Sequence, residues 1–439
     1  MSEQHEPAGA SPLWSKPGAA VEADAMAFMS RDDVILDREL FPFDIRATRA
    51  HVNGLASIGL IEPSDAAAIG EALAELDSLF ATGGFVLDER FEDGHTAIES
   101  FLVERLGETG TRVHLGRSRN DQVAVAMRLY MIEVLDRVAG ACRAIGRSAL
   151  RAAKAHEFAP MPGYTHLQRA VPSTVGLWMG SFAEGFADCA ELCDLTRGWL
   201  DASPLGTAAG YGVNLPLARE AVASELGFAR IQVNPMAAQA SRGRLEHQIV
   251  ATLWQAMQEV RRLAWDYSLF SAEEFGFVTL GPGFVTGSSI MPNKKNPDMA
   301  ELLRASAAVV GGAMGEIQQA MSLPSGYHRD LQVTKPALVR AVKVSLEALS
   351  HIPRLIETAT LNTERMASAM DPAMFATDHA VKLAGDGLPF RDAYVRAAEA
   401  IGGMRDEDCD ADASVRARVS PGGCGAPMLD AIEARLSES

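Results

Sequence analysis

The sequence has few cysteines, and their spacing suggests neither a disulfide framework nor a structural zinc site. The five cysteines form an odd set without CxxC spacing: Cys142, Cys189, Cys193, Cys409 and Cys424. Cys189 and Cys193 stand four residues apart on a predicted helix, where small side chains of this kind usually fill the core. We therefore expect a reducing compartment and no metal site.

Long apolar runs and basic clusters are also missing. No stretch approaches the ~20 apolar residues that cross a bilayer, and the N-terminal segment lacks the basic-then-apolar pattern of a signal peptide. The formal net charge of -17 disfavours binding to phosphate backbones and anionic membranes. We expect a cytoplasmic protein whose partners include neither nucleic acid nor a membrane.

The motifs of common nucleotide-binding and zinc enzymes are absent as well. The chain has no P-loop, no GxGxxG dinucleotide motif and no HExxH. Its composition is otherwise that of a globular protein, with 48% hydrophobic and 22% charged residues over 439 positions. A chain of this length can bury a large core, and it usually forms more than one domain.

Helical periodicity dominates the second part of the sequence. Apolar residues recur at helical intervals in five long segments, 121–156, 174–201, 240–275, 297–321 and 335–359. Alternating strand patterns hardly occur. Helices of roughly 25 to 35 residues would be about 40 to 50 Å long, which suits a bundle. The sequence therefore predicts an all-α fold around a central long-helix bundle.

Three domains are expected from the positions of these helices. Residues 1–117 predict a small helical N-terminal domain, 118–362 the central long-helix bundle, and 363–439 a small helical C-terminal domain. In the first domain, Ser64 and Asp65 are predicted to cap an Ala-rich helix. Long-helix bundles often complete their cores by forming oligomers.

Gly-rich and Pro-rich connectors separate the long helices, at 160–173, 203–216, 276–297 and 323–335. The 22-residue connector 276–297 is long for a structureless loop, and loops of this length are usually functional. It combines three glycines and two adjacent hydroxyls with lysines ahead of a predicted helix: Gly281, Gly283, Gly287, Ser288, Ser289, Lys294 and Lys295. This set favours binding of a carboxylate or phosphate, although solvated surface lysines would give the same pattern.

Two further polar segments lie on connectors. His166, in Thr165-His166-Leu167-Gln168, could serve as an acid, a base or a ligand, or could be structural. The segment 114–122 (HLGRSRNDQ) places two arginines before a long helix, where they could bind carboxylates or simply be solvated beside a helix cap. Together the three polar segments predict a site for a polyanionic substrate and proton abstraction beside a carboxylate.

Three motifs resemble those of a known superfamily. The segment 287–297 (GSSIMPNKKNP), with Glu301 beyond it, resembles the signature of the fumarase/aspartase/argininosuccinate lyase superfamily. The doubled lysine, HLGRSRNDQ and PGYTHLQRA resemble its argininosuccinate lyase branch, and the resemblance runs from about Trp14 to the C-terminal helix. It implies three mostly helical domains and a homotetramer with a twenty-helix core. It further implies active sites shared by three subunits.

The resemblance also implies a reaction and its residues. Argininosuccinate would be eliminated to L-arginine and fumarate, in arginine biosynthesis, without a metal or an organic cofactor. Ser288 resembles the catalytic base, His166 the residue that protonates the departing nitrogen, Glu301 the group that orients it, and Lys294 the cation that stabilises the developing charge. Substrate contacts implied by position are Ser118, Arg119, Asn120, Thr165, Gln168, Asn296, Tyr327, Gln332, Lys335, Arg242, His95 and Asp37.

The sequence departs from the family pattern in three places. Asp33 stands where a substrate-binding serine is common, residues 240–244 (ASRGR) replace a Ser-Asp-Arg-Asp run, and LWSKPG replaces the usual WGGRF. These departures bear on the amino-acid end of the substrate more than on its fumarate end. Two alternatives therefore stay open: a related lyase that releases fumarate from another N-substituted aspartate, and a catalytically silent structural protein.

Overall fold

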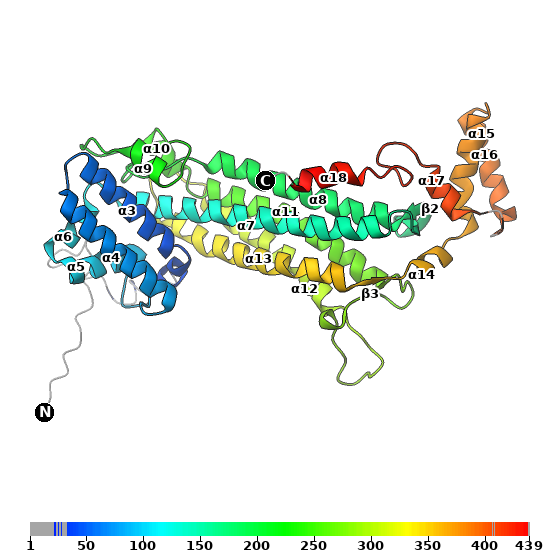
Figure 1. Cartoon of the computed structure of the whole chain (residues 1–439), viewed down its shortest axis with the longest axis horizontal. Coiled ribbons are helices and arrows are strands. Elements are labelled where there is room, and N and C mark those ends of the chain that lie inside the picture. Colours follow the sequence, from blue (N-terminus) through cyan, green and yellow to red (C-terminus); the bar gives the residue numbers. More distant parts are fainter. Residues whose placement is uncertain are drawn as a thin grey trace. The chain divides into compact units, whose positions relative to one another are not determined.

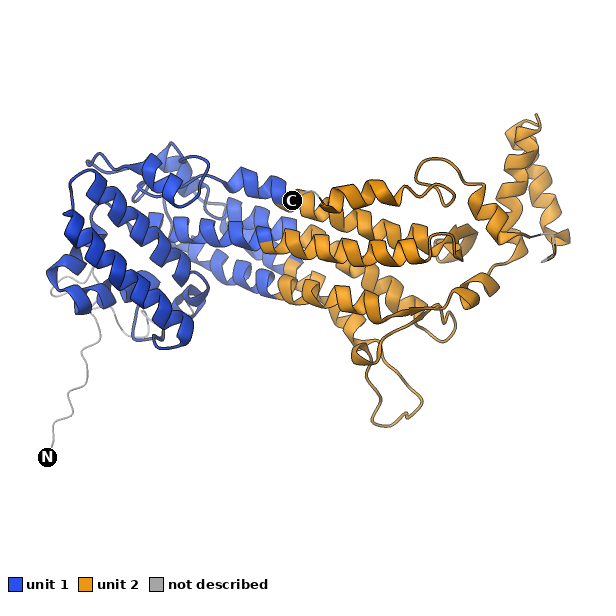
Figure 2. Ribbon diagram, viewed as in Figure 1, with its two compact units in different colours: residues 1–136, 194–252, 311–343 blue, residues 137–193, 253–310, 344–439 orange. Residues whose placement is uncertain are grey.

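The computed structural model describes residues 22, 25, 28, 33–405, 407 and 409–437 (Figure 1). By its internal contacts the chain forms two compact units (Figure 2). Unit 1 comprises Met1–Asp136, Asp194–Thr252 and Gly311–Lys343, and unit 2 comprises Arg137–Cys193, Leu253–Val310 and Val344–Ser439. The predicted site residues fall into two groups, one in each unit.

Five long helices confirm the predicted all-α fold. They are α7 (Arg119–Ala155), α8 (Val175–Leu200), α11 (Arg244–Phe270), α12 (Asp298–Ala320) and α13 (Thr334–Thr358). Each observed helix overlaps one predicted segment, because the apolar residues that recur at helical intervals are the ones buried between helices. Side-chain hydrogen bonds also join neighbouring helices, such as the Thr196 and Thr252 hydroxyls at 3.0 Å in unit 1.

Shorter helices complete unit 1. In chain order they are α2 (Asp33–Leu36), the 3-10 turn η1 (Asp37–Glu39), α3 (Phe41–Ser57), α4 (Pro63–Thr82), α5 (Gly94–Leu106), α6 (Glu108–Thr111), η2 (Arg112–His114), α9 (Arg219–Glu225), α10 (Pro235–Ala240) and η4 (Arg329–Val333). Apolar side chains of α3, α4 and α5 pack into one core, which includes Leu55, Leu73 and Leu102. This core holds the N-terminus of α5 in a defined place.

The predicted cap of α4 is wrong. The helix begins at Pro63, and its N-cap residue Glu62 makes no side-chain capping bond. Proline suits the first helical position because its missing N–H would have no partner there. Ser64 and Asp65 therefore lie inside the first turn. At α5, by contrast, Asp93 is a true cap and accepts from the Thr96 N–H at 2.8 Å.

Unit 2 contains a β-hairpin where the sequence predicts a connector. Strands β1 (Pro160–Thr165) and β2 (Gln168–Thr174) pair antiparallel, with an irregularity between Pro162 and Tyr164. A second pair, β3 (Val278–Thr279) and β4 (Thr360–Leu361), is only two residues long. The hairpin presents His166 at its tip.

The remaining elements of unit 2 are short. They are η3 (Pro282–Phe284), α14 (Thr363–Ser368), η5 (Pro372–Phe375), α15 (Ala376–Gly385), α16 (Phe390–Ala400), η6 (Ile401–Gly403), α17 (Ala411–Arg416) and α18 (Leu429–Ser437). Helix α18 is tied to α8 by Arg435, whose guanidinium lies 2.6 Å from Asp188. Within the part of the chain that the structure describes, no helix combines the length and apolarity needed to cross a membrane.

Candidate active site

The N-terminus of α7 positions three predicted substrate contacts. Asp121 is buried in the first turn, and one carboxylate oxygen accepts from the Ser118 N–H at 2.9 Å. The other oxygen accepts from the Gly206 and Ala208 N–H groups at 3.0 and 2.9 Å. Burial raises the pKa of Asp121, although these N–H donors favour its charged form. The carboxylate thereby fixes the start of α7 against the connector 203–216.

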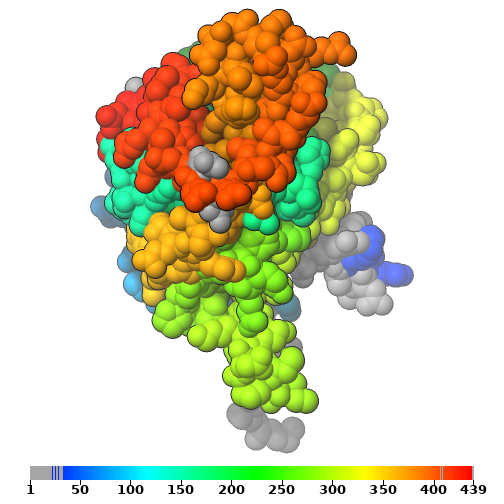
Figure 3. Space-filling view, turned by 90° about the vertical axis from the view of Figure 1, so that its right-hand side faces the viewer, coloured from blue at the N-terminus to red at the C-terminus, as the bar shows by residue number. Residues whose placement is uncertain are grey.

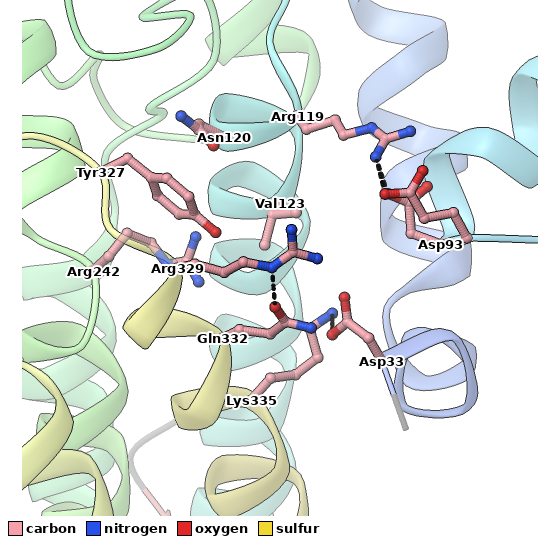
Figure 4. A pocket seen from close by; sticks show the side chains of 11 residues that line it. Asp33, Asp93, Arg119, Asn120, Val123, Arg242, Tyr327, Arg329, Gln332 and Lys335 are labelled. Atoms are coloured by element: carbon pink, nitrogen blue, oxygen red, sulfur yellow. Dashed lines mark hydrogen bonds and ion pairs between the residues drawn. The ribbon is translucent and has the colours of Figure 1, made fainter. Parts of the chain in front are cut away.

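A pocket of about 230 Å³ opens in unit 1 beside this helix start (Figure 4). Six of the predicted substrate contacts line it: Arg119, Asn120, Arg242, Tyr327, Gln332 and Lys335. The other lining residues are Asp33, Glu92, Asp93, Val123 and Arg329. Residues from five separate stretches of sequence therefore meet here, and both signs of charge face the same cavity.

On the acidic side of the pocket, Arg119 pairs with two carboxylates. Its guanidinium lies 2.8 Å from Glu92 and 3.3 Å from Asp93, and it donates to the Thr96 hydroxyl at 3.0 Å. Burial would lower the pKa of Arg119, but the charge of Asp93, followed by Glu92, raises it. The arginine is permanently charged and is held by the capped N-terminus of α5.

Lys335 lies between two aspartates at another wall of the pocket. Its ammonium is 2.6 Å from a carboxylate oxygen of Asp33 and 2.6 Å from one of Asp37. Burial alone would lower the pKa of Lys335, but the two nearby carboxylates raise it. Asp37 is also fixed by the Gly94 N–H, which donates to its second oxygen at 2.8 Å.

The basic side of the pocket is held by hydrogen bonds from within unit 1. Arg242 donates to Glu246 at 3.0 Å, and Arg329 donates to the Gln332 side chain at 3.1 Å. Behind Arg242, the buried Arg128 donates to the Ser241 hydroxyl at 3.1 Å. Burial lowers the pKa of Arg128 to about 10. This bond fixes the segment 240–244 in which Arg242 lies.

Three predicted contacts of unit 1 lie outside this pocket. Ser118 accepts from the Asn120 N–H at 3.3 Å, and Asp37 lines a separate, much smaller cavity. His95 lines that small cavity and forms a buried ion pair with Asp44. Burial would lower the pKa of His95, but the carboxylate of Asp44, with smaller contributions from Asp93 and Asp37, raises it. Contact of these three residues with substrate stays a prediction.

The connector 281–296 forms a loop that projects from the surface of unit 2 (Figure 3). Its base is closed by two backbone bonds between Thr286 and Asn296, at 2.8 and 3.1 Å. The Ser288 hydroxyl accepts from the Ile290 and Met291 N–H groups at 3.3 and 3.1 Å. Lys294 follows on the exposed part of the loop. Ser288, Lys294 and Asn296 are thus carried by one loop with a closed base.

The hairpin turn carries the second group of predicted residues in unit 2. Thr165 pairs with Gln168 across a two-residue turn formed by His166 and Leu167, whose φ angles are +54° and +58°. Two consecutive left-handed residues make a tight hairpin turn, and they are strained when neither is glycine. All four side chains are exposed. Strain of this kind is commonly found where a side chain must be aimed.

Glu301 lies in the first turn of α12, next to the loop base. Its carboxylate is 3.5 Å from the Arg304 guanidinium, which lies over the Trp265 ring at 3.9 Å from the ring centre. The stacked arginine restricts the carboxylate on its exposed helix face. No group of three or more potential metal-ligating side chains occurs among the described residues.

Four pocket residues were not predicted from sequence: Glu92, Asp93, Val123 and Arg329. Glu92 and Asp93 precede a glycine at the start of α5, which is an ordinary helix-start pattern without a catalytic motif. Arg329 lies between Tyr327 and Gln332, and that proximity was the available signal. The two acids enter the pocket only because α5 packs beside the start of α7.

Comparison with known proteins identifies the family. Residues 19–312 match a family model described as lyase. A protein of Sorangium cellulosum (strain So ce56) named argininosuccinate lyase is 50% identical over 424 residues, which are 97% of this chain and 98% of that protein. The chain belongs to the argininosuccinate lyase family. It is therefore an enzyme of the lyase class.

Other relatives agree with this placement in the argininosuccinate lyase family. A protein of the same name from Xylella fastidiosa (strain 9a5c) is 49% identical and covers 96% of this chain and 95% of its own length. Among solved structures, EDDS lyase in complex with formate superposes with a TM-score of 0.77 at 25% identity, over 95% of this chain and 91% of that one. The fold and the family are thus consistent with each other.

Proposed function

We propose that this chain converts argininosuccinate reversibly to L-arginine and fumarate, as a carbon–nitrogen lyase of arginine biosynthesis. The observation that carries the proposal is the 50% identity, over nearly the whole of both chains, to a protein named argininosuccinate lyase. The pocket of unit 1 supports it, because basic, amide and acidic side chains suit a substrate with three carboxylates and a guanidino group.

Ser288 is the proposed base of the elimination. Removing a proton beside a carboxylate creates a doubly charged aci-carboxylate, and Lys294, Asn296 and N–H groups of the loop would stabilise that charge. A free serine hydroxyl is a weak base. The two N–H donors on the Ser288 oxygen support the assignment, because they favour the anionic form of that oxygen.

His166 is the proposed acid that protonates the departing guanidino nitrogen, with Glu301 as the group that orients it. The strained turn supports a precise placement of the imidazole, with Thr165 and Gln168 beside it. In this scheme the reaction uses only a positioned acid, a positioned base and fixed charges. It requires neither a metal nor an organic cofactor.

We propose a homotetramer with a twenty-helix core and active sites shared by three subunits. The proposed base, acid and Lys294 belong to unit 2, whereas the pocket belongs to unit 1. Large apolar side chains are exposed on α8, α11 and α12, among them Trp199, Trp265 and Leu302, as expected of faces that other copies cover. Domains of 1–117, 118–362 and 363–439 and a cytoplasmic location also belong to this proposal.

Ultraviolet detection of fumarate, with arginine assayed in parallel, tests the reaction. Equal amounts of both products are expected from argininosuccinate. Ser288→Ala should lose at least about 100-fold in kcat, because proton transfer contributes on the order of 100-fold or more. Ser289→Ala, which removes the neighbouring hydroxyl, is the matched comparison and should lose less than about tenfold.

The outcomes separate the base from the reaction. Equal losses in the two serine variants would overturn the assignment of Ser288. No fumarate from the folded wild-type protein would overturn the reaction itself, and adenylosuccinate, aspartate and malate would then be assayed. The family relationship would remain in either case, since it rests on sequence identity.

A further inference from the structure

The aspartates around Lys335 carry more charge than the lysine balances. The Lys335 side chain is 4% exposed, and its ammonium lies 2.6 Å from a carboxylate oxygen of each of Asp33 and Asp37. One ammonium compensates one carboxylate, so the three groups together carry an excess negative charge when both aspartates are ionised. An additional cation beside them would therefore be stabilised.

Asp33 is the aspartate that faces the pocket. Its side chain is 21% exposed and lines the cavity, whereas that of Asp37 is 9% exposed and accepts from the Gly94 N–H. Burial raises the pKa of Asp33; Lys335 opposes this shift and the charge of Asp37 adds to it. A carboxylate has about four acceptor positions, so Asp33 can bind Lys335 and a second donor together.

The other acids of the pocket are engaged with Arg119. Glu92 and Asp93 lie 2.8 and 3.3 Å from its guanidinium, and Asp93 also caps α5. Asp33 lies apart from them, beside Gln332 (Figure 4). A cationic group of the substrate would accordingly meet Asp33 first on this wall.

The substrate has one cation that suits this position, given the proposed function on which this argument rests. The guanidino nitrogen leaves from the reacting carbon, so it must lie with Ser288 and His166, and neither is among the described residues that line the pocket. The pocket would then receive the opposite end of the arginine moiety, with its α-carboxylate and α-ammonium. Tyr327, Gln332 and Arg329 suit the carboxylate.

We propose that Asp33 is a specificity-determining residue that binds the α-ammonium group of the arginine moiety. Asp33 supplies both a negative charge and hydrogen-bond acceptors at this wall of the pocket. A serine hydroxyl could accept a hydrogen bond from the ammonium but would supply no charge. Asp33 therefore makes the pocket select an amino-acid end over an end that carries a carboxylate alone.

Titration calorimetry of the full-length protein tests the proposal with two ligands. L-arginine carries the α-ammonium, and 5-guanidinopentanoate has the same chain, guanidino group and carboxylate but lacks it. Wild-type protein should bind arginine about tenfold more tightly, as expected of one charge-assisted hydrogen bond. Asp33→Asn and Asp33→Ser should bring this ratio closer to one, because both remove the charge and so weaken the binding of arginine. Asp33→Glu should retain more of the preference than either.

Glu39→Gln is the matched control. Glu39 lies in the same 3-10 turn as Asp37 and pairs with Lys343 at 2.8 Å on the surface, outside the pocket. The substitution Glu39→Gln removes one negative charge near the site and should leave the ratio of arginine binding to 5-guanidinopentanoate binding unchanged. Circular dichroism of each variant verifies that it is folded.

Each result decides the proposal. A wild-type ratio near one, no binding of arginine by the wild type, or an unchanged ratio in folded Asp33→Asn would overturn it. An equal loss in Glu39→Gln would also overturn it, as an effect of net charge. If the protein releases fumarate but the Asp33 variants keep the wild-type preference for arginine, only the role of Asp33 is contradicted. If the variants lose that preference but the wild type releases no fumarate, only the proposed reaction is contradicted.

Discussion

The buried pair of His95 and Asp44 couples the stability of unit 1 to pH. The imidazole is surrounded by carboxylates, with Asp44 in contact and Asp93 and Asp37 nearby. Burial favours the neutral ring, but these charges outweigh it and raise the pKa of His95. The folded protein therefore binds this proton more tightly than the unfolded chain does.

The expected pH dependence follows from that direction. The unfolded histidine has a pKa of about 6.5, so the stabilisation is fully present below about pH 6.5 and is lost as pH rises through the higher folded value. His95→Gln should lower the free energy of unfolding most at acid pH, and the difference from wild type should shrink as pH rises. Urea unfolding of both proteins from about pH 5.5 to 9 measures this difference in the free energy of unfolding.

His351→Gln, on an exposed position of α13, controls for the substitution itself. Its difference from wild type should stay small at every pH because the ring faces solvent. A difference for His95→Gln that is constant with pH would contradict the coupling to Asp44.

Individual site residues could be predicted where they belong to a sequence motif. They could not be predicted where they enter the pocket through a contact between distant segments of the chain. Arg119 and Gln332 were predicted from their motifs and line the pocket. Glu92 and Asp93 became pocket residues because they pair with Arg119 across two helices, which no local pattern reveals. His95 was predicted as a substrate contact, but what the structure places against its ring is Asp44.

At the scale of elements, the hairpin of β1 and β2 stores backbone strain beside a proposed catalytic group. His166 and Leu167 both have positive φ, and Leu167 is 72% exposed. Histidine tolerates this region better than leucine does. The strain therefore lies mainly at Leu167. The tight turn that requires this strain fixes the direction of the His166 side chain.

Leu167→Gly should stabilise the protein while slowing the reaction. Glycine adopts positive φ without steric cost, so the free energy of unfolding should rise by about 0.5 to 1 kcal/mol. The looser turn should lower kcat by roughly tenfold, because His166 would be less well placed. Denaturant unfolding and the fumarate assay measure the two effects.

Leu167→Ala separates strain from exposed apolar surface. Alanine keeps the Cβ and hence the steric cost at positive φ, so it should not stabilise the protein. Equal stabilisation by glycine and alanine would show that solvation of the leucine, and not backbone strain, is responsible.

The long helices could be predicted from sequence, whereas the hairpin could not. Helices α7 and α13 contain many turns of the same apolar periodicity, so their signal accumulates. The hairpin strands contain Pro160, Pro162 and Pro172, which do not donate to a ladder, and no alternating pattern. The turn itself lacks the Asn-Gly or Gly-Gly pair that usually marks it.

At the scale of the whole molecule, the proposed chemistry depends on how copies of the chain assemble. The hairpin with His166 and the loop with Lys294 are separate segments of unit 2, each with an exposed tip. If the sites are shared among subunits, the intact His166 and the intact Lys294 of one site come from different chains. Two inactive variants could then complement each other.

Mixing His166→Asn with Lys294→Ala, after dissociation and reassembly in equal amounts, tests this arrangement. Each variant alone should be nearly inactive, and the mixture should recover about one quarter of wild-type activity, since each of two contributing chains is intact in half of the cases. His166→Asn mixed with His166→Ala is the control and should recover nothing, because no chain supplies the imidazole. No recovery in the first mixture, despite subunit exchange shown by mass labelling, would mean that one chain supplies both groups.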